Sequence, residues 1–266
     1  MKTINKLLLL LLFTGMGFQS FSQGKEDARS IMKMSLDNGK YKGIETSSTL
    51  KIIDKKGRER IRELYMASKL YEKEKLEKRL ILFLAPAEVK GTGMLIIDYD
   101  KKPDDLWIYM PAIRKTRRIV SSEKKKSFMG SEFSNADMTT ANLDDYSYKL
   151  QGSENVDGTD CWKIESIPNN NEVMESTGYA KEKIFLGKAD NVIRKVIFYN
   201  ADNELFKTLI ARDVKMIDNR NGKNMAMYML MENHQNKRKS EIRINEVKVN
   251  ESLEDQMFSI DFIEKQ

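Results

Sequence analysis

Cysteine and histidine are almost absent from this chain. Its 266 residues contain one of each, Cys161 and His234. Cys161 precedes Trp162 in an alternating pattern, which is typical of a small buried side chain. His234 lies between asparagine and glutamine residues that predict a solvated turn. A single cysteine excludes an internal disulfide, and this pair is too small a ligand set for a zinc site. We therefore expect no metal, no cofactor and no cysteine–histidine catalysis.

Long hydrophobic runs are also missing, apart from a short one at the N-terminus. Lys2 and Lys6 precede an apolar run over residues 7–13 that is too short to span a bilayer. Ser20 and Ser22 then provide the small residues of a cleavage site. This pattern predicts a signal peptide over residues 1–22, cleavage before Gln23, and export of a soluble mature protein. The alternative is a retained membrane anchor.

The chain has few prolines, and no linker or low-complexity run divides it, so we expect residues 23–266 to form one domain. The formal net charge of +6 suits an anionic lipid surface or an acidic partner. Nucleic acid is not expected as a partner, because the cations are not interleaved with aromatic residues. The acidic pairs Asp104–Asp105 and Asp144–Asp145 fall in predicted turns, where carboxylates are solvated. Nothing in the chain therefore predicts an enzyme.

The strand signals outnumber the helix signals. An amphipathic helix is predicted over residues 27–38 and a weaker one over residues 135–145. The charged run over residues 72–79 is predicted to be a solvated turn. Turn residues at regular spacing separate strands over residues 179–186, 192–199, 205–217, 225–232 and 239–249. We expect a mainly β fold with a few helices, built on one strongly curved antiparallel sheet or half-barrel of about eleven strands.

Two groups of apolar residues could line a binding cavity. Met225, Met227, Met229 and Met231 alternate along one predicted strand and so share one face. Methionine is flexible and can adapt to acyl chains of varying shape, although the same pattern also fits an ordinary core. The second group could extend the lining or could equally be core. It contains Trp107, Tyr109, Phe128, Met129 and Phe133.

A short basic run follows the aromatic strand. Its cations are Arg114, Lys115, Arg117 and Arg118. Arginine forms bidentate contacts with phosphate, so this run could hold anionic groups at the mouth of an apolar cavity. The alternative is a solvated strand edge.

Three ordered segments carry a family resemblance. They are KGTGMLIIDYD from Lys90, DDLWIYMPAIRKTRRI from Asp104 and SFMGSEFS from Ser127. Together they resemble the signature of the outer-membrane lipoprotein-sorting family, whose fold is that of the carrier LolA. Two departures are visible: residues 134–137 replace an acidic pair and an aromatic, and Phe185 stands where the family has tryptophan.

The resemblance implies a curved sheet with helices on its concave side. It also implies a periplasmic carrier of lipid or of lipoprotein acyl chains, acting beside an inner-membrane transporter. The alternative function is an envelope sensor or adaptor of the same fold that binds a protein partner and transports nothing.

Overall fold

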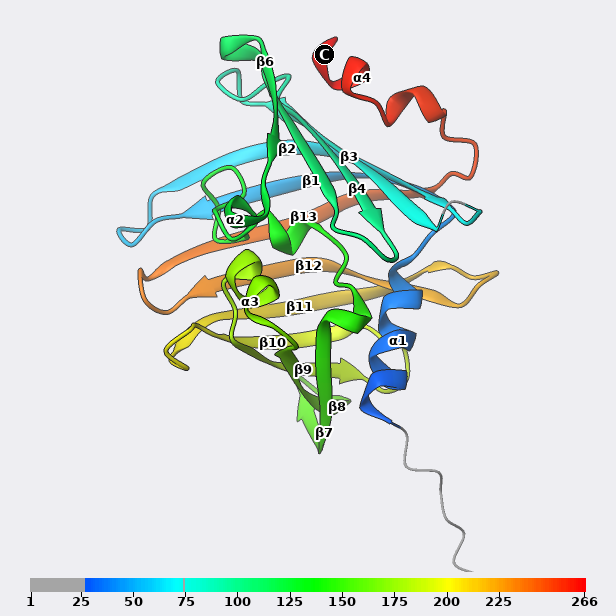
Figure 1. Ribbon diagram of the computed structural model, residues 1–266, viewed down its shortest axis with the longest axis vertical. Coiled ribbons are helices and arrows are strands. Elements are labelled where there is room, and N and C mark those ends of the chain that lie inside the picture. The colour runs from blue at the N-terminus through cyan, green and yellow to red at the C-terminus, as the bar shows by residue number, and fades with distance from the viewer. Residues whose placement is uncertain (1–26, 74) are drawn as a thin grey trace, which may run out of the picture.

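A single antiparallel sheet forms most of the protein (Figure 1). The computed structural model describes residues 27–73 and 75–266. The predicted signal peptide and its cleavage site lie outside these residues. The strands are β1 (Gly43–Ile53), β2 (Glu59–Tyr71), β3 (Leu76–Ala85), β4 (Gly93–Tyr99), β5 (Asp105–Met110), β6 (Lys115–Ile119), β7 (Tyr146–Val156), β8 (Thr159–Pro168), β9 (Lys181–Gly187), β10 (Ile193–Tyr199), β11 (Leu205–Asp218), β12 (Lys223–Asn233) and β13 (Arg238–Val249).

The helices are few and short. They are α1 (Ala28–Gly39), α2 (Ser121–Lys124), α3 (Asn171–Thr177) and α4 (Ile260–Glu264), with the 3₁₀ turns η1 (Pro111–Ile113), η2 (Ala136–Met138), η3 (Leu143–Asp145) and η4 (Asp255–Met257). The helix predicted at residues 27–38 is confirmed as α1. The helix predicted over residues 135–145 is wrong, since η2 and η3 are separate turns. Side-chain contacts of Thr140 hold the backbone between them, as described below.

The strand order explains how the chain covers its own sheet. The order is β6-β5-β4-β3-β2-β1-β13-β12-β11-β10-β9-β8-β7 in a 13-stranded sheet. The chain therefore builds one half from β1 outward to β6, moves to the opposite edge, and returns from β7 to β13. The segment over residues 120–145 joins these two edges. We call it the crossing connection.

The mainly β class with few helices is confirmed, but two details of the prediction are wrong. The sheet has 13 strands rather than about eleven, and β5 and β6 form an antiparallel hairpin at one edge. The predicted strong curvature is also wrong, because the sheet is not strongly curled. It is open, since β6 and β7 end it without pairing to each other. Its twist places β3 and β4 obliquely in front of the central strands (Figure 1).

The sheet buries apolar side chains on both faces. The larger cluster unites α1 and the crossing connection with strands from both halves, and Ile31, Leu50 and Phe83 are among its fully buried members. Cys161 is buried, as predicted. His234 lies in a turn, as predicted, and is partly exposed, with its Nε2 2.8 Å from Thr208 Oγ1.

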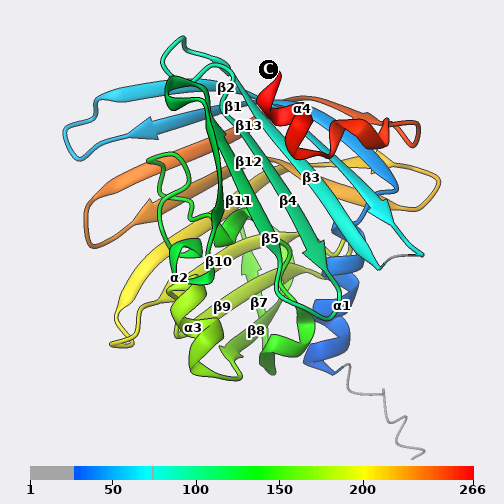
Figure 2. The same ribbon diagram turned by 45° about the horizontal axis from the view of Figure 1, so that its top comes forward.

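A smaller cluster joins β3 and β4 to the C-terminal segment. Leu82, Leu95 and Ile263 are buried there. Figure 2 shows this segment, in red, lying over the β3 and β4 end of the sheet. Gly93 permits the close approach, because a Cβ at this position would lie 2.8 Å from Cβ of Ile263. This explains a glycine within the KGTG segment.

Candidate functional site: an apolar cavity with buried acids

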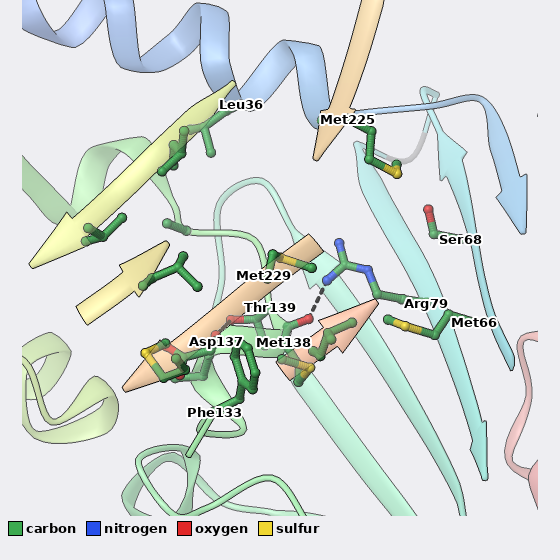
Figure 3. Close-up of a pocket in the computed structure, with 18 of the residues that line it drawn as sticks. Leu36, Met66, Ser68, Arg79, Phe133, Asp137, Met138, Thr139, Met225 and Met229 are labelled. Atoms are coloured by element: carbon green, nitrogen blue, oxygen red, sulfur yellow. Dashed lines mark hydrogen bonds between the residues drawn. The ribbon is translucent and has the colours of Figure 1, made fainter. Parts of the chain in front are cut away.

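A cavity of about 470 Å³ lies beneath the crossing connection. Its wall combines α1, strands from both halves of the sheet and the crossing connection (Figure 3). Most of the lining is apolar and includes Met66, Phe133, Met138, Ile184, Phe198 and Ile242. Residues that are far apart in the sequence therefore meet around one space, because the strand order brings β1 beside β13.

Three of the four alternating methionines line this cavity. Met225, Met229 and Met231 contribute to its wall from β12, together with Phe133 from the crossing connection. Met227 is buried, but it is not among the lining residues. The alternation therefore identified a strand that faces the cavity, although one of its four methionines, Met227, does not line the wall.

The other predicted lining residues lie elsewhere. Trp107 and Tyr109 pack in the cluster under the C-terminal segment. Phe128 is fully buried, and its ring centroid lies 5.7 Å from that of Phe83. Met129 packs beside it against the larger core cluster, and its carbonyl accepts a hydrogen bond from Arg62. None of these four residues contributes to the wall of the cavity.

The basic run lies on the edge strand β6 and at its start. Arg117 pairs with Glu123 at 2.7 Å, and Arg118 pairs with Asp105. Arg114 and Lys115 are exposed, and among the described residues they form no ion pair. Exposed cations on an edge strand also hinder its pairing with another chain. The structure thus separates two free cations from two that are neutralised.

A buried ionic cluster that sequence reasoning missed lies at one end of the cavity. Glu77 and Asp98 are opposite each other on β3 and β4, and both are buried. Arg79 lies 3.3 Å from Glu77 Oε1 and 3.4 Å from Asp98 Oδ2. Ser68 Oγ donates a hydrogen bond to Glu77 Oε1 at 2.7 Å. The predicted solvated turn over residues 72–79 is therefore wrong in its second half, since β3 begins at Leu76.

Arg79 also holds the crossing connection. Its guanidinium donates a hydrogen bond to the carbonyl of Met138 (Figure 3). It also donates to Thr140 Oγ1 at 3.0 Å. Burial raises the pKa of Asp98 to about 7, and the attraction of Arg79 opposes that rise. The alternation of Glu77 and Arg79, with Asp98 on the next strand, is a sequence signal for such a cluster.

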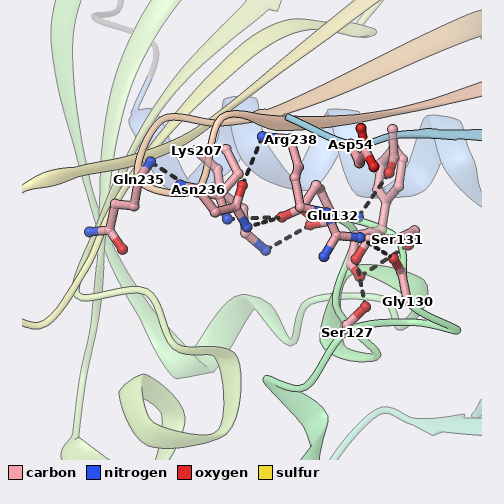
Figure 4. A network of polar contacts seen from close by, with 12 residues as sticks. Asp54, Ser127, Gly130, Ser131, Glu132, Lys207, Gln235, Asn236 and Arg238 are labelled. Atoms are coloured by element: carbon pink, nitrogen blue, oxygen red, sulfur yellow. Dashed lines mark hydrogen bonds and ion pairs between the residues drawn. The ribbon is translucent and has the colours of Figure 1, made fainter. Parts of the chain in front are cut away.

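A second set of polar contacts anchors the other side of the crossing connection, around Glu132 (Figure 4). Its carboxylate lies 3.0 Å from Arg238 Nε and accepts hydrogen bonds from Asn233 and Asn236 at 2.8 and 3.1 Å. Lys207 Nζ donates to its carbonyl at 2.7 Å. The SFMGSEFS segment is thus fastened to β11, β12 and the β12–β13 turn.

Two further acids belong to the cavity wall, Asp137 and Glu182. Asp137 accepts hydrogen bonds from the Tyr179 hydroxyl at 3.1 Å and from the Ser134 backbone at 2.7 Å. The carboxyl group of Glu182 forms no hydrogen bond or ion pair with any residue that the structure describes. Burial and the nearby Asp137 raise the pKa of Glu182 to about 8, so its carboxyl is mainly protonated at pH 7.

Other kinds of site find little support in the described part of the chain. Within residues 27–73 and 75–266, no cluster of histidine, cysteine or acidic residues is placed to hold a metal ion. No helix in these ranges has both the length and the apolar character needed to cross a membrane.

Comparison with known proteins agrees with this architecture. A family model described as an uncharacterized protein matches residues 75–265. The solved structure of an outer membrane lipoprotein-sorting protein domain from Vibrio parahaemolyticus is 26% identical, with a TM-score of 0.81 over 89% of this chain and 98% of that chain. A DUF1329 family protein from Desulfovibrio piger is 28% identical, with a TM-score of 0.82 over 89% of this chain and 97% of that chain.

A more distant match shows the fold alone. A LolA superfamily protein from Nitrosomonas europaea is 21% identical, with a TM-score of 0.67 over 88% of this chain and 98% of that chain. None of the curated proteins compared with this chain matches it significantly. The chain therefore belongs to the uncharacterized protein family whose model matches residues 75–265, and its fold is that of the outer membrane lipoprotein-sorting, LolA-like proteins.

Proposed function

We propose that this protein is a carrier that binds lipid, or the acyl chains of lipoproteins, in the cavity beneath the crossing connection. The observation that carries the proposal is the apolar cavity of about 470 Å³. Its size falls within the roughly 300–1,000 Å³ of small-molecule sites. Each CH₂ group transferred from water into such a wall contributes about 0.8 kcal/mol, so an acyl chain can bind without catalysis and leave again.

The expected place of action is the bacterial envelope. The predicted signal peptide supports export to the periplasm, and the similarity to an outer membrane lipoprotein-sorting protein domain supports a role in lipid or lipoprotein transfer. An inner-membrane transporter is the proposed source of cargo. Release requires only that the crossing connection or the cargo move, because we assign no covalent step.

Exchanging Met229 for glutamine tests the cavity assignment. Met229 lines the cavity, so Met229→Gln places an amide where the acyl chain would lie. A buried amide without partners costs about 1–3 kcal/mol, and the affinity for a fluorescent acyl probe should fall roughly tenfold. Probe titration measures the affinity, and the urea midpoint measures the stability of the empty protein, which should change little.

Met216→Gln is the matched control for this test. Met216 lies on β11 and is 51% exposed, so the same exchange should alter neither the affinity nor the urea midpoint. A large loss of stability in Met229→Gln, with unchanged probe affinity in the folded fraction, would show that Met229 is packed core. If the wild-type protein bound no acyl probe but captured an envelope protein, the adaptor alternative would replace the carrier.

The two unpaired cations of the basic run are proposed to contact an anionic membrane surface. Each cation near such a surface contributes about 1 kcal/mol, so reversing both Arg114 and Lys115 to glutamate should weaken binding to anionic liposomes at least about tenfold. Liposome co-sedimentation at low and physiological salt measures this change. The wild-type binding should also decrease as salt is added.

Reversal of Lys55 and Lys56 provides a control with the same change in net charge. These exposed lysines lie in the β1–β2 turn. If both double variants lost liposome binding equally, overall charge and not the basic run would be responsible. Unchanged binding in the Arg114 and Lys115 variant would leave the run as a solvated strand edge.

A further inference from the structure

The cavity is acidic although the protein is basic overall. Its titratable lining includes Glu77, Asp137 and Glu182 but only one cation, Arg79. Asp98 and Lys207 lie directly behind the wall and balance each other in charge. The formal net charge of the whole chain is nevertheless +6. The charge inside the cavity is therefore opposite in sign to that of the protein as a whole.

Most of these charged groups are already occupied. Arg79 bridges Glu77 and Asp98 at 3.3 and 3.4 Å. Asp137 accepts hydrogen bonds from Tyr179 and from the Ser134 backbone. Lys207 donates to the carbonyl of Glu132 at 2.7 Å, and its charge also favours the ionised form of Asp137. These groups hold the crossing connection in place and leave no free partner for a ligand.

Glu182 is the exception. It lies on β9, where its cross-strand neighbours are Ser166 and Phe198, and it contributes to the cavity wall. No described residue donates a hydrogen bond to its carboxyl group or forms an ion pair with it, and the charge that shifts its pKa is the like-charged Asp137. Glu182 is only partly buried, and its carboxyl group faces a largely apolar cavity without a partner. Such a placement is unfavourable, and a structure retains it more readily where a ligand completes the group.

We propose that the cavity selects amphiphiles whose polar head is a protonated amine, with Glu182 as the counter-ion of that amine. This deepens the proposed carrier function and rests on it. An ammonium group offers three hydrogen-bond donors and a positive charge, which the carboxyl group of Glu182 lacks in the protein alone. An ammonium head supplies the opposite charge that lets Glu182 release its proton to water and form an ion pair, whereas a carboxylate head offers no such counter-charge and keeps Glu182 in its protonated form.

The chemistry could come from two sources. One is a lipid with an amine head, and the other is a lipidated polypeptide with a free N-terminal amine. Both combine an apolar chain with a protonated nitrogen. The cavity recognises this shared feature, and the experiment separates the sources.

Isothermal titration with ligands of one chain length tests the selectivity. We would compare dodecylamine, dodecanol and dodecanoate at pH 7, below their aggregation concentrations. The amine should bind at least about tenfold more tightly than dodecanoate, because a charge-assisted hydrogen bond is worth roughly 1.5–3 kcal/mol. Non-specific attraction to this basic protein would favour dodecanoate, so it cannot produce the expected order.

Two variants test whether Glu182 causes the preference for the amine over the acid. Glu182→Gln should remove this preference and leave the affinity for dodecanol unchanged. Glu175→Gln makes the same chemical change at an exposed position on α3 and should keep it. Native mass spectrometry with phosphatidylethanolamine, a diacylated lipopeptide and their N-acetylated forms then identifies the source. Acetylation should abolish the advantage of whichever ligand is natural.

The outcomes distinguish a failure of the amine preference from a failure of the carrier function. Equal affinity for the amine and the acid, or a preference that survives Glu182→Gln, would overturn the inference while leaving the carrier function intact. If none of the three ligands bound, dodecanol included, the carrier function and the inference would both be wrong. Should the glutamine variant fail to fold, the comparison of amine with acid in the wild-type protein still decides.

Discussion

Replacing Arg79 with methionine is expected to lower the free energy of unfolding by about 3–5 kcal/mol. Arg79 is the only described cation placed between Glu77 and Asp98, which face each other on neighbouring strands. Without it, two buried carboxyl groups would repel each other or take up protons. The variant would also lose the hydrogen bonds to Met138 and Thr140 that hold the crossing connection.

Urea denaturation at pH 7 measures this loss, and Arg243→Met is the matched control. Arg243 lies 3.3 Å from Asp213, but both side chains are more than half exposed. Exposed ion pairs contribute about 0–1 kcal/mol, so the control should remain close to the wild type. Similar losses in the two variants would show that Arg79 contributes no more than a surface pair. The Arg79 variant should also gain susceptibility to proteolysis within residues 120–145, because that segment loses its β3 contacts.

Replacing Glu182 with glutamine is expected to stabilise the protein at alkaline pH. The pKa of Glu182 is raised from its ordinary value of 4.5 to about 8 in the folded protein. Between these values the unfolded chain releases a proton that the folded protein retains. The contribution of this carboxyl group is thus fully present below pH 4.5 and is lost as the pH rises to about 8, by about 1.4 kcal/mol per pH unit.

The glutamine side chain does not titrate. The free energy of unfolding of the variant, relative to that of the wild type, should therefore be higher at pH 8 than at pH 5 by a few kcal/mol. Urea midpoints at several pH values measure the difference. Asp98 acts in the same direction, since its pKa is raised from 3.8 to about 7, and it remains in both proteins. Glu175→Gln should reproduce the wild-type profile. A wild-type stability that does not fall between pH 5 and pH 8 would contradict the burial of both carboxyl groups.

Local signals in the sequence determined much of the secondary structure. The helical spacing after Asp27 identifies α1, and the turn residues between apolar runs identify the strands from β9 to β13. Alternation along β12 predicts one shared face, and Met225, Met229 and Met231 do line one cavity. These features depend on residues close together in the chain, so a sequence pattern is sufficient to predict them.

The wall of the cavity was decided by tertiary structure. Strand order brings β1 beside β13 and places β6 and β7 at opposite edges, so the crossing connection must span the sheet. Local patterns cannot predict this, since the free energy of pairing distant strands depends on the whole chain. The same arrangement places Trp107 and Tyr109 under the C-terminal segment and away from the cavity.

The burial of charged residues also depends on contacts between segments that are distant in the chain. Glu77 and Arg79 occur in a charged stretch that the sequence pattern assigns to solvent, and Glu182 lies in a predicted strand. Burial depends on what packs above a strand, and here α1 and the crossing connection cover these side chains. The sequence alone thus determined that the protein has an antiparallel sheet with a methionine-lined face. Only the tertiary structure placed acids inside the cavity, because desolvation arises from contacts between segments that are distant in the chain.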